Sequence, residues 1–112
     1  MTDISRAILS SVFYATELTG DDKHEMMNVE ISPDDFQLHF QKIMAHLFNH
    51  LKDSGAPVTF DVAMIHLNNQ NVFDQNEILS IMSATPFGTK SMVDSYLKIL
   101  RTDNRKSLIG RI

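Results

Sequence analysis

Hydrophobic residues recur along most of the chain at steps of three and four positions, which is the period of an amphipathic α-helix. The first such run predicts a helix over residues 3–15. Its apolar and small positions are Ile4, Ala7, Ile8, Ser11, Val12 and Ala15. The segment Thr19–Asp22 then predicts a turn, because it contains a glycine followed by two acidic residues. After this turn, His24–Val29 predicts a short second helix.

The clearest helix-start pattern is Ser32-Pro33-Asp34-Asp35. A serine is a good N-cap, proline suits the first helical position, and carboxylates are favourable beside the positive end of a helix. We therefore expect a long helix over residues 33–53, ended by Gly55. Its apolar face is made by Phe36, Phe40, Ile43, Met44, Leu47, Phe48 and Leu51.

Two shorter helices are predicted after Pro57, which prevents the long helix from continuing. Thr59 is expected to cap the first of them, which ends in the polar run Asn68–Asn71. Asp74 is expected to cap the second. The apolar residues of these two helices are Val62, Ala63, Met64, Ile65, Leu67, Ile78, Leu79, Ile81 and Met82.

A final helical pattern follows the break at Thr85–Gly88. It runs from Met92 to Leu100, gives way to the polar segment Arg101–Lys106, and resumes up to Ile112. An apolar pattern that is still open at the last residue favours a fragment of a longer protein, since chain ends are usually polar. The pattern as a whole predicts an all-α protein, a compact orthogonal bundle of about six helices.

Composition narrows this picture to one helical domain without thiol chemistry. The 112 residues are 43% hydrophobic and include 4 glycines, 3 prolines and no cysteine, which excludes disulfides and thiolate zinc sites. The net charge of −4 gives the chain no general attraction for nucleic acids. There is no apolar run long enough for a membrane span and no signal peptide, so we expect a cytoplasmic protein.

The patterns that usually carry catalysis are missing. The four glycines are isolated and no Gly-Lys-Ser/Thr sequence occurs, which excludes a phosphate-binding loop in this chain. No serine has the glycine-flanked setting of a nucleophile. The acidic pairs Asp21/Asp22 and Asp34/Asp35 lie at helix ends or turns, where helix electrostatics explains them. We therefore expect no catalytic or cofactor-binding residue here, and no enzyme in this chain.

One histidine cluster resembles a metal site. His39, His46 and His50 fall close together in angle along the long predicted helix, and the last two have the i,i+4 spacing that lets two imidazoles share an ion. Histidines at the edge of an apolar face more often pack their rings, however, and no acidic residue nearby completes a ligand set. We predict no metal site from them, while a histidine-rich metal-binding domain remains an alternative.

The order of these elements resembles a known family. The relevant segments are Ile8–Val12, Ile31–Phe36, Asp53–Val58, Ile78–Pro86 and Tyr96–Arg101. In sequence and spacing, the first three resemble the opening helix, the "leucine, x, proline, x, aspartate, phenylalanine" step and the "glycine, x, proline, aliphatic" turn of one domain. The last two resemble the pre-proline helix and the "tyrosine, aliphatic, arginine" hairpin entry of the same domain. That domain is the N-terminal domain of the bacterial replicative DNA helicase, the DnaB family.

Three departures from the family pattern accompany these matches. Thr59 stands where an acidic cap is usual, Gln41 stands where a histidine is common, and Arg105–Ile109 is out of register. The last departure affects the hairpin assignment most.

The resemblance implies the N-terminal part of a hexameric, ATP-driven helicase whose motor, with its ATP and magnesium, lies in a C-terminal domain outside this chain. Residues 1–88 would form a globular helical subdomain, and residues 89–112 would begin a helical hairpin, here truncated. In that family the N-terminal domains pair through the hairpin into a ring-shaped collar and bind the C-terminal domain of primase. A helicase loader is a further possible partner, and DNA is reached only through the full ring.

The resemblance also implies an interface, carried by the residues of the hairpin's first helix. These are Tyr96, Ile99, Leu100 and Arg101. Two alternatives stay open. The helicase-binding C-terminal domain of primase has a similar fold, although a Met1 start and an open C-terminal pattern favour the beginning of a longer protein. The second alternative is a small metal-binding domain or an unrelated adaptor domain.

Overall fold

The computed structural model describes residues 4–15 and 20–109, with the backbone alone for Asp22 and residues 104–109. Within these ranges the chain is all-α, as predicted, with six α-helices, one short 3-10 helix and no strand. The elements are α1 (Ile4–Phe13), α2 (Gly20–Met27), η2 (Pro33–Asp35), α3 (His39–Ser54), α4 (Phe60–Asn69), α5 (Gln75–Ser83) and α6 (Lys90–Ile109). Of the predicted features, Thr19 in the turn and the last apolar residue Ile112 lie outside the described residues.

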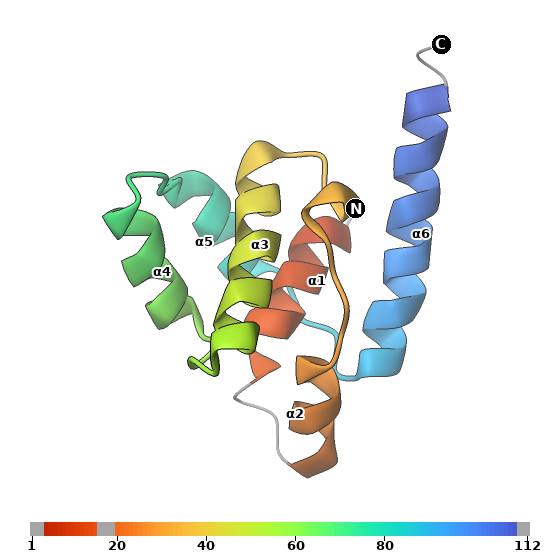
Figure 1. Cartoon of the computed structure of the whole chain (residues 1–112). Coiled ribbons are helices and arrows are strands. Elements are labelled where there is room, and N and C mark those ends of the chain that lie inside the picture. Colours follow the sequence, from red (N-terminus) through yellow and green to blue (C-terminus); the bar gives the residue numbers. More distant parts are fainter. Residues whose placement is uncertain (1–3, 16–19, 110–112) are drawn as a thin grey trace.

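The helices surround α1, which α3 crosses at the centre of the molecule (Figure 1). α4 and α5 lie on one side of this centre and α6 lies on the other, while α2 lies near one end. The last turns of α6 extend past the rest of the molecule. None of the helices in the described part of the chain has the length and apolar character needed to cross a bilayer.

Most of helix α1 is buried, because it contacts α2, α3, α5 and α6. Ile8, Leu9 and Phe13 are at most 1% exposed, and each contributes roughly 1.5–3 kcal/mol through its burial. Its serines satisfy polar groups inside the core. The Ser10 hydroxyl donates to the carbonyl of Ala84 at 3.1 Å, and Ser11 Oγ accepts from the amide of Phe87 at 2.7 Å. The sequence predicted a helix with one apolar face, whereas in the structure this helix is the central one and most of its surface is buried.

The prediction of one helix over 33–53 is wrong at its start. Ser32 is an N-cap, as expected, and it forms a capping box with Asp35, but this box closes only a single 3-10 turn. Phe36 then adopts an extended conformation, with φ −115° and ψ 148°, and α3 begins at His39. The extended backbone places the Phe36 ring in the core, where it is 1% exposed. Burial of this ring therefore overrides continuation of the helix.

Helix α2 also begins earlier than predicted. It starts at Gly20, whose φ of +60° suits glycine, so Asp21 lies in the helix and not in a turn. Met26 of this helix is fully buried, and Met27 is half-buried and packs against the core. Lys23, His24 and Glu25 are exposed, so only the end of this helix contributes to the core.

The other helix ends agree with the sequence. Gly55 ends α3 with a left-handed φ of 74°, as expected for a residue just past a helix. Thr59 Oγ1 accepts from the amide of Val62 at 3.2 Å, and Asp74 Oδ1 accepts from the amide of Glu77 at 3.0 Å. Helix α6 is continuous through Arg101, where the sequence predicted a change of pattern.

Candidate protein-interaction surface

Helix α6 presents two different faces. Val93 and Leu97, one turn apart, are at most 1% exposed and belong to the common core. Met92 and Ile99 lie away from this buried face and are 44% and 46% exposed. The helix is therefore anchored along one side, and its other side carries large apolar side chains in contact with solvent.

The four residues that the family resemblance assigned to an interface divide between these faces. Tyr96 and Leu100 are half-buried and pack against the core, whereas Ile99 and Arg101 are exposed. The Tyr96 ring stacks on Phe87, with ring centroids 4.3 Å apart and planes within 7° of parallel. This stack holds the loop before α6 against the helix, so Tyr96 positions α6. Among the four, Ile99 is the apolar side chain left for a partner.

Arg101 is engaged within the chain. Its Nε donates to Asp35 Oδ1 at 2.8 Å, and its Nη2 donates to Asp35 Oδ2 at 3.0 Å and to the Glu30 carbonyl at 3.1 Å. The hydrogen bond to Asp35 raises the pKa of the Arg101 guanidinium. Because Asp35 also accepts from the Ser32 amide, the pair fixes α6 to the η2 turn. Arg101 therefore sets the direction of α6.

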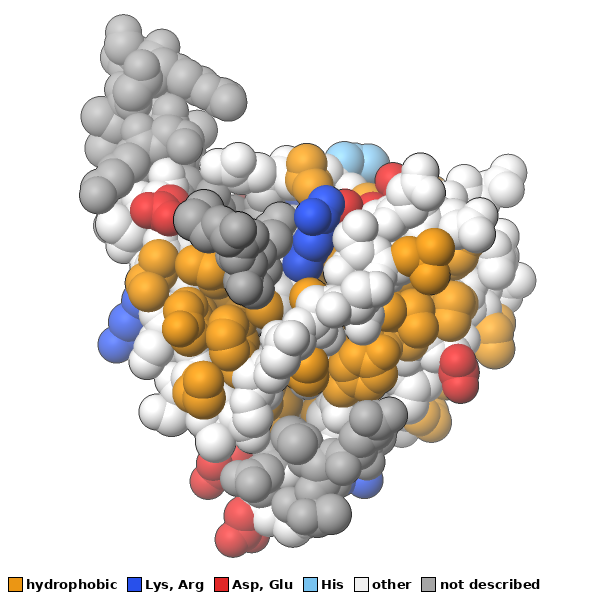
Figure 2. Space-filling view, turned by 180° about the vertical axis from the view of Figure 1, so that it is seen from behind, with side chains coloured by type: hydrophobic (Ala, Val, Ile, Leu, Met, Phe, Trp, Pro, Cys, Tyr) orange, Lys and Arg blue, Asp and Glu red, His pale blue; other side chains and the backbone are white. Residues whose placement is uncertain are grey.

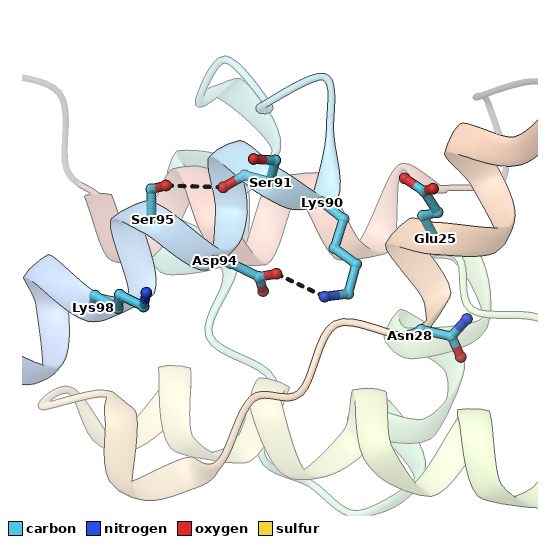
Figure 3. Close-up of a pocket in the computed structure, with 7 residues that line it drawn as sticks. All are labelled: Glu25, Asn28, Lys90, Ser91, Asp94, Ser95 and Lys98. Atoms are coloured by element: carbon cyan, nitrogen blue, oxygen red, sulfur yellow. Dashed lines mark hydrogen bonds and ion pairs between the residues drawn. The ribbon is translucent and has the colours of Figure 1, made fainter.

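A polar cleft separates α6 from α2 (Figure 3). It is open, has a volume of about 500 Å³, and is lined by Glu25, Asn28, Lys90, Ser91, Asp94, Ser95 and Lys98. Lys90 Nζ lies 2.6 Å from Asp94 Oδ2, and this hydrogen bond raises the pKa of Lys90. Charges of both signs are mixed in the cleft, so it has no strong preference for one kind of ion. The side chains of Arg105 and Lys106, further along α6, lie outside the part of the chain that the structure describes.

A buried polar network, which the sequence did not reveal, joins three helices. Arg6 on α1 binds both carboxylate oxygens of Glu77 on α5, at 3.1 and 2.8 Å, and Gln41 Nε2 on α3 donates to Glu77 Oε2 at 3.0 Å. Gln41 is 1% exposed. Arg6 within an otherwise apolar segment was the available signal, while Glu77 resembled an ordinary residue of a helix first turn. The network has a structural role.

The histidines are not arranged as the metal-like pattern suggested. His39 lies on the first turn of α3 and outside the cavity that His46 and His50 line. That cavity includes His66 from α4, whose ring centroid is 6.2 Å from that of His50. The cluster predicted from the sequence did not include His66. Among the described residues, no set of three His, Asp or Glu side chains is placed to hold a metal ion.

Exposed apolar side chains gather in two areas of one face of the molecule (Figure 2). The two areas, one on the α6 side and one on the side of α4 and α5, are separated by a band of backbone atoms and non-hydrophobic side chains. The exposed large side chains are Met92 and Ile99 on α6, Ile65 on α4, Leu79 on α5, and Leu38 and Phe73 in loops. Apolar surface of this kind is typical of protein-binding sites.

Comparison with known proteins identifies no relative of this chain. No protein-family model, curated protein or solved structure matches this chain. The function is therefore inferred from the geometry of α6 and its surroundings, together with the sequence resemblance.

Proposed function

We propose that this chain is a protein-interaction domain of the kind found at the N-terminus of DnaB-type replicative helicases, and that it binds partners through the outward side of α6. One observation carries the proposal. The buried residues Val93 and Leu97 and the Arg101–Asp35 pair hold the helix, while Met92 and Ile99 remain exposed. A helix held in this way offers a rigid apolar strip to a partner.

The chemistry of the described residues favours binding over catalysis. The charged groups that lie close together neutralise each other in pairs, which are Arg6 with Glu77, Lys90 with Asp94, and Arg101 with Asp35. A catalytic site instead needs a nucleophile or base with a hydrogen-bond partner that activates it. Exposed Ile and Met side chains on a helix have the composition of a docking surface.

Within this proposal the chain contributes contacts, and a motor domain elsewhere in the parent protein contributes ATP hydrolysis with magnesium. The expected partners are further copies of the same domain, which form a collar, and the C-terminal domain of primase, which couples priming to unwinding. A helicase loader is a further candidate. DNA would be bound by the assembled ring, in the cytoplasm.

The test is a binding titration of this chain with the C-terminal domain of primase from the same organism. Isothermal calorimetry should give a saturable heat with one site per chain, and sedimentation should show a complex. No heat with primase, together with a monomeric chain at every concentration, would contradict the proposal. Binding to the N-terminal domain of the helicase instead of to primase would support the alternative that the chain is the primase domain.

A further inference from the structure

The cavity between α3 and α4 has an apolar floor and a rim of histidines. Its volume is about 140 Å³. Leu47 and Leu67, both nearly buried, line its inner part. The remaining lining residues are Ile43, His46, His50, His66 and Gln70. Three of the five histidines of the chain therefore share one small cavity, although they come from two helices.

Two of these rings are close enough to share one ion. The ring centroids of His50 and His66 are 6.2 Å apart, with an angle of 75° between the planes. An imidazole nitrogen lies about 1.2 Å from its ring centroid and binds zinc at about 2.0 Å, so two rings on one ion have centroids about 5.2 Å apart at a tetrahedral angle and about 6.4 Å apart in a linear arrangement. The observed separation lies between these two values, so a rotation of the side chains that brings the rings about 1 Å closer gives the tetrahedral angle.

The two imidazoles are also chemically available. Neither the His50 nor the His66 side chain forms a hydrogen bond or ion pair within the described part of the chain, so their nitrogens are not committed elsewhere. No acidic residue lines the cavity. Imidazoles without carboxylates select late transition ions such as Zn²⁺, Ni²⁺ and Cu²⁺ over Mg²⁺ and Ca²⁺, which prefer oxygen ligands.

We propose that His50 and His66 form a two-histidine site for a divalent late transition ion, which joins α3 to α4. Water completes the coordination, because the described residues supply no third side chain already in place. The site lies on α3 and α4, so it is independent of the partner-binding role of α6. An ion that binds the folded chain more tightly than the unfolded chain stabilises the fold.

The experiment is thermal unfolding of the chain with and without Ni²⁺ or Zn²⁺, at about pH 8, where imidazoles are neutral ligands. At a free metal concentration about tenfold above the dissociation constant, the melting temperature should rise by about 5 °C. EDTA should reverse the rise, and Mg²⁺ should not produce it. No rise with either transition ion would overturn the proposal.

Three variants locate the ion. His50→Ala and His66→Ala should each abolish the rise, whereas His39→Ala, which removes an exposed histidine of the same helix outside the cavity, should retain it. If His66→Ala keeps the rise, the ion is held along α3 by His46 and His50, which are at i,i+4 spacing, and the proposal is wrong. If the His66→Ala variant does not fold, His66→Gln replaces it. In addition, shifts of the His50 and His66 proton resonances when Zn²⁺ is added to the wild-type chain show whether both residues bind the ion.

Discussion

Two arginine–carboxylate pairs, Arg6–Glu77 and Arg101–Asp35, connect segments that are far apart in the sequence. In each pair the carboxylate side chain is only 10% exposed, whereas the arginine is 34% or 44% exposed. A buried carboxylate that loses its partner is costly, because it keeps its charge without water. The importance of these arginines for stability therefore lies in satisfying a buried acid.

Arg101→Ala should lower the free energy of unfolding by about 1–2 kcal/mol, below the value for a fully buried pair because Arg101 is partly exposed. Urea denaturation measures this. Lys98→Ala is the matched control, since Lys98 is an exposed basic residue of the same helix, and it should change stability by less than about 0.5 kcal/mol. Equal effects of the two substitutions would contradict the structural role of Arg101.

The Lys90–Asp94 pair provides a prediction about protonation. Asp94→Asn should lower the pKa of Lys90 towards its ordinary value of 10.5, because the hydrogen bond to Asp94 is the main cause of the raised pKa. The pKa of Lys90 is higher in the folded chain than in the unfolded chain, so the pair contributes its full stabilisation at pH values below the unfolded-state pKa. This stabilisation is lost as the pH rises through the folded-state pKa. NMR titration of the Lys90 side chain measures the change. An unchanged pKa in the variant would mean that the pair does not persist in solution.

Among the helices, the sequence predicts the boundaries marked by Thr59, Asp74 and Gly55 better than the helix start near Pro33. Thr59, Asp74 and Gly55 act locally, through a side-chain oxygen or a backbone angle, and local chemistry is visible in the sequence. The Ser32–Asp35 box is equally local, but whether it starts a 3-10 turn or an α-helix depends on the burial of Phe36 in the core. That burial requires the other helices to be in place.

Gly55→Ala should destabilise the domain by about 1 kcal/mol, because the position has a φ of +74° that an L side chain adopts only with strain. An added Cβ would meet no atom within 4 Å, so the cost comes from the backbone alone. Gly88→Ala is the control, since its Cβ also has open space and its φ is not positive. Thermal unfolding of both variants should show a lower melting temperature for Gly55→Ala only.

For the whole molecule, hydrophobic periodicity correctly predicts an all-α protein, because helices bury one face at a fixed period. It does not predict which helices cross. The His50–His66 contact and the Arg6–Glu77–Gln41 network depend on crossings between separate helices, so the sequence pattern could not pair these residues. Among the residues assigned to α6, the pattern did not separate the exposed Ile99 from the half-buried Tyr96.

The proposed binding of partners to the outward side of α6 can be tested with two substitutions. Ile99→Glu and Ile65→Glu place the same charge at two exposed isoleucines, one on α6 and one on α4, that are 46% and 59% exposed. Calorimetric titration with the C-terminal domain of primase compares them with the wild-type chain. We expect Ile99→Glu to weaken binding at least about tenfold, as for an apolar contact at an interface centre, and Ile65→Glu to bind like wild type. Unchanged binding by Ile99→Glu, or a loss confined to Ile65→Glu, would contradict the account.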